Sequence, residues 1–366
     1  MRAAVLREQP GELFIEDLRV DQPGEGEVLI DVAAAGLCHS DLHFMQAKFK
    51  TRLPSVLGHE SAGVVREVGT GVRHVQPGDH VVCCTSVFCG ECHSCLAGHP
   101  YLCTDTDRLG RARTHTPRLS RDDGTSVDQF ARLGGFAEQM LVSERAVVRI
   151  PDDIPLDRAA LVGCAVLTGT GAVFRTAQIE PGSSVAVIGA GGIGLAAIQG
   201  ARIAGAGTVI AVDVTGDKLE TAQTFGATQT VNAREVDDVV GAVRELTDGG
   251  VEYSFEAIGS KPTAEQAFRM LAPRGTATII GMVPSNQPLE IRGMDLLAGR
   301  RLQGSIMGSN RFRIDIPRLL EMYRDGRLLL DELISGRIEL DAINDGYDAL
   351  DQGTVTRSVI VFDDGN

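Results

Sequence analysis

Two patterns of hydrophobic residues divide the chain. Up to about residue 165, short apolar runs are separated by turns rich in glycine and proline, which predicts a β-rich, barrel-like domain. Its predicted strands are Glu27–Val32, Ser61–Val68, His80–Cys84 and Phe136–Val142. Residues 104–133 are polar and show no hydrophobic period, so we expect a long surface loop there.

From Ser184 onward, apolar strands alternate with amphipathic helices. The strands are predicted at 184–188, 208–213, 251–257 and 276–281, and the helices at 192–204, 216–225 and 263–271. Beyond residue 307, the pattern predicts a helix over Ile316–Tyr323 and a last strand over Ser358–Phe362. Because such alternation is typical of a parallel sheet with helices on both faces, the predicted fold class is α/β, with a separate β-rich domain.

Length and charge narrow the class of protein. With 366 residues, the chain exceeds the size at which one core usually stops growing, about 250–300 residues, so two domains are expected. The net charge is −14, which disfavours nucleic-acid partners because phosphate binding needs a basic face. No apolar run reaches the roughly 18 residues of a membrane helix, and the apolar start before Arg7 is too short for a signal peptide. We therefore expect a cytoplasmic protein without a membrane partner.

A glycine loop follows the predicted strand at 184–188 and opens the next predicted helix. It consists of Gly189, Ala190, Gly191, Gly192, Ile193 and Gly194. In a dinucleotide-binding loop the first glycine permits a tight turn, the second lets a pyrophosphate approach and the third allows close packing of helix on strand. Asp213 ends the following strand, where an acidic side chain binds the adenosine ribose and repels a 2′-phosphate. The pattern predicts NAD, and the alternative is an ordinary glycine turn with a capping Asp213.

Cysteines supply the candidate metal chemistry. Four of them stand at the spacing C-x2-C-x2-C-x7-C, namely Cys89, Cys92, Cys95 and Cys103. Four thiolates can meet at one tetrahedral point, so this run predicts a structural zinc site. Spacing alone does not join Cys38, His59 and Cys164, and for each of them taken singly a buried structural residue is the better interpretation. Cys83 and Cys84 lie in an apolar strand and are expected to be structural.

Taken together, these segments resemble the zinc-containing alcohol dehydrogenases of the medium-chain dehydrogenase/reductase superfamily over essentially the whole chain. The motifs that carry the resemblance are Gly36–Asp41, Gly58–Gly63, the four-cysteine run, Gly163-Cys164, the glycine loop, Asp213, Leu296–Ile306 and Thr356–Ser358. The resemblance implies a GroES-like catalytic domain built from residues 1–165 and 307–366. A Rossmann NAD-binding domain, residues 166–306, is then inserted between the two parts.

The resemblance also implies roles for residues of the reaction site. Cys38, His59 and Cys164 correspond to the ligands of a catalytic zinc, and the four clustered cysteines to those of a structural zinc, so two zinc ions per subunit are expected. Ser40 corresponds to the hydroxyl that touches the substrate oxygen, and His43 to the histidine that passes the proton to solvent. Asp41 corresponds to the acid that orients the histidine ligand, and Glu60 to a carboxylate near the metal.

For the cofactor, the resemblance points to a further set of contacts. They are Asp213 and Lys218 at the adenosine ribose, Arg357 at the pyrophosphate and Thr168 near the nicotinamide. His39 stands where many relatives carry an arginine against the pyrophosphate. A histidine there can still donate a hydrogen bond, but its charge depends on pH, so we expect a looser and more pH-dependent grip on NAD.

The expected function is reversible hydride transfer between a zinc-bound primary alcohol, medium-chain or aromatic, and NAD, giving an aldehyde and NADH. An apolar substrate pocket is expected from Phe49, Thr85, Phe130 and Met282, with plain core packing as the alternative for each. Glutathione-dependent formaldehyde dehydrogenases carry an acidic residue where this chain has Phe49. The long 104–133 segment resembles that of the longer, dimeric enzymes, so a homodimer is expected.

Three alternative functions remain open at this point. The first is oxidation of an S-(hydroxymethyl)thiol, as in formaldehyde dehydrogenases. The second is a zinc-free double-bond reductase of the same superfamily, which the presence of Cys38, His59 and Cys164 disfavours. The third is a non-enzymatic NAD-binding structural protein, since fold alone does not imply function.

Overall fold

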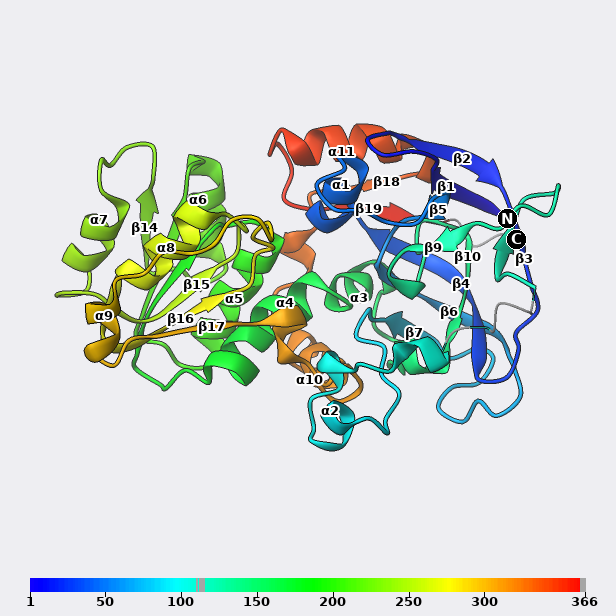
Figure 1. The fold of residues 1–366 in the computed structure, drawn as a ribbon, viewed down its shortest axis with the longest axis horizontal. Coiled ribbons are helices and arrows are strands. Elements are labelled where there is room, and N and C mark those ends of the chain that lie inside the picture. Colours follow the sequence, from blue (N-terminus) through cyan, green and yellow to red (C-terminus); the bar gives the residue numbers. More distant parts are fainter. Residues whose placement is uncertain (110, 112–115, 363–366) are drawn as a thin grey trace. The chain divides into compact units, whose positions relative to one another are not determined.

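The computed structural model describes residues 1–109, 111 and 116–362, and the chain divides into two compact units. Unit 1 comprises Met1–Cys164, Arg311–Arg324 and Leu330–Asn366, and unit 2 comprises Ala165–Asn310 and Asp325–Leu329. Each unit therefore contains segments that are far apart in the sequence, as the colours of Figure 1 show.

Unit 1 is built on mostly antiparallel sheets. The largest has the strand order β11-β7-β6-β4-β19-β18, with β10 also paired to β4. Its strands are β4 (Glu27–Gly36), β6 (Glu60–Val68), β7 (His80–Cys83), β10 (Gln139–Ser143), β11 (Val147–Arg149), β18 (Gly336–Ile338) and β19 (Ser358–Val361). The C-terminal strand β19 pairs antiparallel with β4, with Val359 opposite Gly36, so both ends of the chain complete one sheet.

Two smaller sheets and five α-helices complete unit 1. A four-stranded sheet has the order β2-β1-β5-β9, and β3 pairs with β8. Their bounds are β1 (Arg2–Leu6), β2 (Leu13–Asp17), β3 (Arg19–Val20), β5 (Ser55–Val56), β8 (Leu119–Ser120) and β9 (Asp128–Gln129). The helices in the described part are α1 (His39–Met45), α2 (His93–Leu96), α3 (Leu156–Val162), α10 (Phe312–Arg324) and α11 (Ile343–Asp351).

The described part of segment 104–133 is more ordered than the expected surface loop. It contains β8, β9 and two short 3-10 helices, η2 (Thr106–Leu109) and η3 (Phe130–Arg132). Leu119, Val127 and Leu133 are buried in the apolar cores of unit 1. The expectation was wrong there because isolated apolar anchors in a polar stretch produce no periodic signal.

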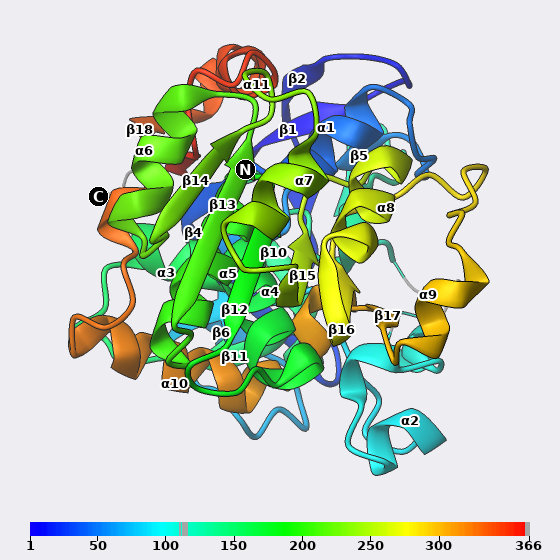
Figure 2. The same cartoon turned by 90° about the vertical axis from the view of Figure 1, so that its left-hand side faces the viewer.

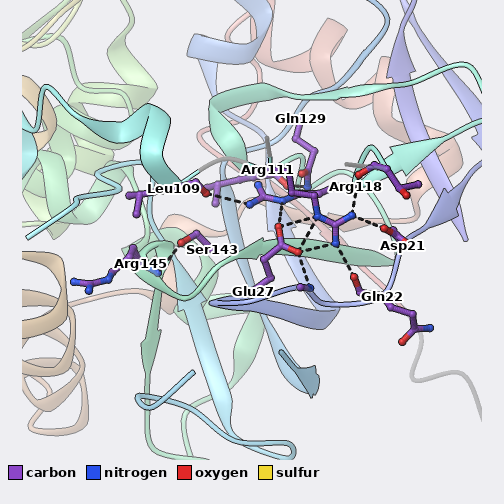
Figure 3. Close-up of polar contacts among 12 residues, drawn as sticks. Asp21, Gln22, Glu27, Leu109, Arg111, Arg118, Gln129, Ser143 and Arg145 are labelled. Carbon is purple, nitrogen blue, oxygen red and sulfur yellow. Dashed lines mark hydrogen bonds and ion pairs between the residues drawn. The ribbon is translucent and has the colours of Figure 1, made fainter. Parts of the chain in front are cut away.

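An ion-pair cluster ties this segment to the start of β4. Arg111 and Arg118 both donate to the Glu27 carboxylate, at 2.7–3.1 Å, and Arg111 also pairs with Asp21 (Figure 3). The backbone N–H of Gly24 donates to the same carboxylate at 2.8 Å. Burial alone would raise the pKa of Glu27, but the two guanidinium groups hold it below its usual value. A buried charge is thereby compensated by several hydrogen bonds.

Unit 2 is a six-stranded parallel sheet with the order β14-β13-β12-β15-β16-β17. Its strands are β12 (Ser184–Ile188), β13 (Thr208–Asp213), β14 (Gln229–Asn232), β15 (Val251–Glu256), β16 (Leu271–Ile279) and β17 (Arg301–Gly304). Counted along the chain this is the order 3-2-1-4-5-6 of a dinucleotide-binding sheet. The predicted doubly wound parallel sheet is confirmed, and Figure 2 looks onto its strands.

Helices flank this sheet, and all of those named here except α9 contain buried residues. They are α4 (Ala165–Gly171), continued by the π-helical η5 (Ala172–Ala177), α5 (Gly192–Ile203), α6 (Gly216–Thr224), α7 (Val239–Glu245), α8 (Lys261–Arg269) and α9 (Gly293–Leu297). Helix α8 starts two residues before its predicted position because the Ser260 hydroxyl caps it by accepting from the Thr263 N–H. Across the described residues, no single helix combines the length and apolar character that crossing a membrane requires, although the bent pair α3 and α4–η5 does so when taken together.

Candidate active site and metal centres

The glycine loop adopts the conformation that its sequence predicts. Gly189 has φ +97°, a region that L side chains rarely adopt. A Cβ on Gly194 would stand 1.7 Å from the carbonyl oxygen of Gly189, so helix α5 can approach the loop only with glycine there. Nothing lies within 4 Å of a Cβ built on Gly191, which leaves room for a ligand beside the backbone. The free N–H groups at the start of α5 then face that space.

Asp213 lies at the carboxyl end of β13 beside this loop. Its Oδ2 accepts a hydrogen bond from the Ala190 N–H at 2.8 Å, and its Oδ1 accepts from Val214 N–H and Thr215 N–H. The carboxylate is 9 % exposed, so it is held rigidly at the carboxyl edge of the parallel sheet. Ligands of such sheets bind at this edge, where the strand order reverses.

The other predicted cofactor residues lie in both units. In unit 2, Thr168 is buried on α4 with its hydroxyl 3.8 Å from the Met307 sulfur, and Lys218 is half-buried on α6. In unit 1, His39 is exposed at the first position of α1. Arg357 is buried and donates to the Leu37 carbonyl at 2.7 Å. Their roles toward NAD stay predictions.

The four clustered cysteines meet in space, as predicted. Their sulfur atoms lie within 4.8 Å of one another, and both Cys89–Cys95 and Cys92–Cys103 are separated by 3.9 Å between sulfurs. Four Zn–S bonds of about 2.3 Å in a regular tetrahedron put sulfurs about 3.8 Å apart. Backbone N–H groups of Cys92 and Glu91 donate to the Cys89 sulfur, which stabilises a thiolate. The lobe, formed by α2 and its flanking turns, therefore fits a zinc ion.

A second cluster joins residues that the sequence spacing leaves apart. Cys38, His59, Glu60 and Cys164 are all buried, and one ligand atom from each lies within 4.8 Å of the other three. Cys38 is the N-cap of α1, and His59 directly precedes β6. Two thiols, an imidazole and a nearby carboxylate are the donor types that zinc takes.

The electrostatics of this cluster favour a cation. The Cys164 thiol hydrogen-bonds Cys38 and lowers the pKa of Cys38 well below its usual value, while the same contact raises the pKa of Cys164. Burial opposes a charge on His59, yet the Asp41 carboxylate and Cys38 raise the pKa of its ring well above the ordinary range. The lowered pKa of Cys38 favours its thiolate, which is the form in which a cysteine binds a metal, and metal binding would release protons from the other ligands.

Two charged partners surround the cluster. Asp41, fully buried, places Oδ2 2.9 Å from Nδ1 of His59 and accepts the Gly58 N–H on Oδ1 at 3.0 Å. An acid at the second ring nitrogen fixes which nitrogen faces a metal. Arg357 lies 3.3 Å from the Glu60 carboxylate. Burial nevertheless raises the pKa of Glu60 to about 8, so this carboxyl group holds its proton at neutral pH.

Residues predicted for proton transfer lie on α1. Ser40 and His43 are three positions apart, so both project from one side of the helix. Burial lowers the pKa of His43, and the charge of Lys48 lowers it further. A neutral ring at physiological pH can accept a proton.

Of the predicted pocket residues, one lies beside a residue of the metal cluster and one lies beside His43. The ring centroid of Phe130 is 5.9 Å from that of His59, and the ring centroid of Phe49 is 6.1 Å from that of His43. Thr85 is half-buried two positions after the end of β7, and Met282 is 40 % exposed after β16 in unit 2. For these last two, a place in the pocket stays a prediction.

The sequence reasoning missed Phe44. Its ring lies 4.6 Å from that of Phe130 and 5.8 Å from that of Phe49, so it connects the two predicted pocket residues. Aromatic residues make up only 4 % of the chain, yet Phe44 and Phe49 stand within six positions of each other, shortly after Cys38. This local enrichment could have indicated that Phe44 belongs to the pocket. Cys83 and Cys84 are buried as expected, and burial raises their pKa values to about 12 and about 11.

Comparison with known proteins gives the family. The family described as "Alcohol dehydrogenase GroES-like domain" matches residues 24–152, and the one described as "Zinc-binding dehydrogenase" matches residues 192–324. Among curated proteins, the S-(hydroxymethyl)glutathione dehydrogenase of Paracoccus denitrificans is 37 % identical over 372 residues, covering 99 % of this chain and 99 % of its own.

Solved structures agree with this. The benzyl alcohol dehydrogenase of Acinetobacter calcoaceticus superposes with a TM-score of 0.91, at 31 % identity over 99 % of both chains. A dehydrogenase structure from Sinorhizobium meliloti 1021, bound to NADP, gives a TM-score of 0.82 at 30 % identity over 99 % of both chains. The chain therefore belongs to the zinc-containing alcohol dehydrogenases of the medium-chain dehydrogenase/reductase superfamily and is an oxidoreductase of that family.

Proposed function

We propose that this protein oxidises medium-chain or aromatic primary alcohols with NAD, reversibly, to aldehydes. The observation that carries the proposal is the buried set of Cys38, His59 and Cys164, faced by the ring of Phe130. Zinc held by these three residues would supply a Lewis acid that lowers the pKa of an alcohol oxygen. NAD would supply the hydride acceptor. The apolar ring beside the ligands excludes water and favours an apolar substituent on the alcohol carbon.

The residues of α1 are proposed to carry the proton. Ser40 would donate its own hydroxyl proton onward as it accepts that of the alcohol, and His43 would receive the proton and release it to solvent. The lowered pKa of His43 supports this role because a neutral ring is ready to accept. Asp41 would keep the second nitrogen of His59 occupied so that the other faces the metal.

NAD is proposed over NADP on the strength of Asp213. Its carboxylate is fixed at the end of β13 by three backbone N–H groups. A negative charge there accepts hydrogen bonds from a ribose and repels a 2′-phosphate. The relative from Sinorhizobium meliloti was solved with NADP, so both cofactors belong in the test.

A second candidate is oxidation of S-(hydroxymethyl)glutathione. The 37 % identity to the Paracoccus denitrificans enzyme favours it. Phe49 disfavours it, because a phenyl ring beside His43 offers no charge to a peptide-like thiol adduct.

A homodimer and a cytoplasmic location stay predictions. Among the described residues β17 is an end strand of the parallel sheet, and this supports the homodimer because sheet edges tend to pair with another chain.

The test is a substrate panel on the zinc-loaded protein. NADH formation would be measured with ethanol, octanol, benzyl alcohol and a mixture of formaldehyde and glutathione, with NAD or NADP, with and without a strong zinc chelator. The proposal expects chelator-sensitive activity with NAD that rises from ethanol to octanol and benzyl alcohol. Activity confined to the glutathione mixture would establish the second candidate instead. Turnover that survives complete removal of zinc would refute both.

A further inference from the structure

Three phenyl rings form one continuous surface next to the candidate metal site. This surface, here called the aromatic wall, consists of Phe44, Phe49 and Phe130. It runs from the ring of His43 through Phe49, Phe44 and Phe130 to the ring of His59, with successive centroids 6.1, 5.8, 4.6 and 5.9 Å apart. All three phenylalanines are half-buried, so each remains partly accessible. Tilted and edge-on contacts of this kind suit an aromatic guest.

Two of these rings sit on a segment with little regular structure of its own. Phe44 belongs to the last turn of α1, and Phe49 lies in residues 46–54, which form neither helix nor strand before β5 begins. Ala47 has φ +58°, an uncommon conformation for a residue with a side chain. Such a segment needs outside contacts to hold its side chains in one place.

Gln9 supplies these contacts from the turn between β1 and β2. Its Nε2 donates to the carbonyl of Phe44 at 2.5 Å and to the carbonyl of Phe49 at 3.0 Å. Its Oε1 accepts the N–H of Thr51 at 3.2 Å. Since the two carbonyls can only accept and the N–H can only donate, the orientation of the amide is fixed by its partners.

The same turn also completes the end of helix α1. The last carbonyls of a helix have no partner within it. Gln9 and the Ala47 N–H both donate to the carbonyl of Phe44, and the N–H of Gly11 donates to that of Met45 at 3.0 Å. The turn between β1 and β2 thus fixes the backbone at Phe44 and at Phe49, the two residues of the aromatic wall that lie close together in sequence.

We infer that Gln9 is a positioning residue for substrate selection: its amide fixes Phe44 and Phe49, and the wall they form with Phe130 selects primary alcohols that carry an aromatic ring. This rests on the proposed function, since it names the substrate class of the same site. The hydrogen bonds of Gln9 go to the backbone of Phe44, Phe49 and Thr51, and none of these is a proposed metal ligand or proton-transfer residue. Its effect on the reaction is expected through the rings alone.

The sharpest test is Gln9→Glu, which keeps the size and the acceptor for Thr51 but replaces both donated hydrogen bonds by repulsion between oxygen atoms. The measurement is kcat/KM for benzyl alcohol and for ethanol on the same zinc-loaded preparation. We expect the ratio of the two to fall roughly tenfold, chiefly through KM for benzyl alcohol, because ring placement governs only the bulky substrate. Any loss of folded protein cancels in the ratio.

Two further variants keep the test specific. Glu8→Gln changes an exposed neighbour in the same turn and should leave the ratio unchanged. Phe44→Leu should lower the ratio by itself, and Gln9→Glu should then add little to it, as expected for two residues that act on one feature. A Gln9→Glu ratio within about twofold of that of the unaltered protein overturns the inference. Failure of the unaltered protein to oxidise either alcohol would instead overturn the proposed function.

Discussion

Asp41 holds two parts of the candidate metal site with its two carboxylate oxygens. One oxygen accepts the Gly58 N–H, and the other lies 2.9 Å from Nδ1 of His59. His59 directly follows Gly58 in the sequence. The resemblance already placed Asp41 behind the histidine ligand. The additional bond to Gly58, which orients the backbone that carries the ligand, became visible only in three dimensions.

Asp41→Asn should weaken the metal site without disturbing the fold. The amide can still accept from Gly58, but it loses the negative charge that faces His59. We expect zinc affinity at this site to fall about 10- to 100-fold, and alcohol oxidation with it. The measurement is zinc content after equilibration with a competing chelator, together with kcat/KM.

Asp345→Asn, an exposed change on α11, is the matched control and should leave both values unaltered. Because the four-cysteine lobe does not involve Asp41, one zinc per subunit should remain bound in Asp41→Asn. If this variant kept both zinc ions as tightly as the unaltered protein, the role of Asp41 as the residue that orients His59 would be wrong.

Other residues differ in how far the sequence could place them. The cysteine spacing alone predicted the lobe, because its ligands are neighbours in sequence. Cys38, His59 and Cys164 came together only through the resemblance, since their spacing carries no local signal. Phe44 was not predicted, because an aromatic residue on a short helix looks like an ordinary core residue until its neighbours are known. Arg357 was expected at a pyrophosphate and in this structure lies against Glu60 and Leu37.

At the scale of elements, prediction succeeded where a pattern was long and regular. The strands at 184–188 and 208–213 were predicted with the bounds that the structure gives them. Helix α11 was missed, although Ile343, Tyr347 and Leu350 repeat at helical spacing on its buried side. The order in segment 104–133 was not predicted, because its buried apolar anchors are isolated and its ion pairs to Glu27 leave no hydrophobic pattern.

The four-cysteine lobe should depend on its metal for stability. It contains only the four-residue helix α2 and a short 3-10 turn, so the lobe has little core of its own. Cys95→Ser should remove one zinc per subunit and lower the free energy of unfolding by about 3 kcal/mol or more. Urea unfolding and metal analysis measure this, with Ser94→Ala as a neighbouring control. Unchanged stability in a zinc-depleted Cys95→Ser protein would contradict the role.

Glu27→Gln should loosen the cluster that anchors segment 104–133. It removes the charged partner of Arg118 and leaves Arg111 with Asp21 alone, and since both arginines are partly exposed we expect a loss of roughly 2 kcal/mol in the free energy of unfolding. Because the folded pKa of Glu27 is below its unfolded value of about 4.3, the contribution is complete above that pH and disappears as pH falls through the folded pKa.

Urea unfolding of both proteins from pH 7 down to about pH 3 checks this sign. The gap between the unaltered protein and Glu27→Gln should be largest at neutral pH and should narrow in acid. The exposed Glu12→Gln change should give no gap at any pH. A gap that widens in acid would show that Glu27 is not stabilised as a carboxylate.

At the scale of the whole molecule, pairing between distant segments was beyond local patterns. Strand β19 was predicted, but its partner β4 lies more than 300 positions earlier, with Val359 opposite Gly36. Only the resemblance implied that both chain ends build one domain. The alternation of strands and helices predicted the parallel sheet but not its strand order, and the edge strands β14 and β17 were not predicted.

A homodimer is the prediction that belongs to this scale. Strand β17 ends the parallel sheet of unit 2, and the nearby helix α9 leaves Met294 and Leu297 74 % and 79 % exposed. An open sheet edge beside exposed apolar side chains is a surface that a second copy can cover. Sedimentation over a range of concentrations should give twice the chain mass of 38.9 kDa, and Leu297→Glu should shift the population toward monomer.

The control is Leu96→Glu, which places the same charge on an equally exposed leucine, 76 % accessible, in the four-cysteine lobe. That variant should remain dimeric, because Leu96 belongs to neither α9 nor β17. A Leu297→Glu protein that stays dimeric would locate the interface away from α9, and an unaltered protein that sediments as a monomer at every concentration would remove the dimer altogether. Either result leaves the buried metal cluster untouched, since Cys38, His59, Glu60 and Cys164 all come from unit 1 of a single chain.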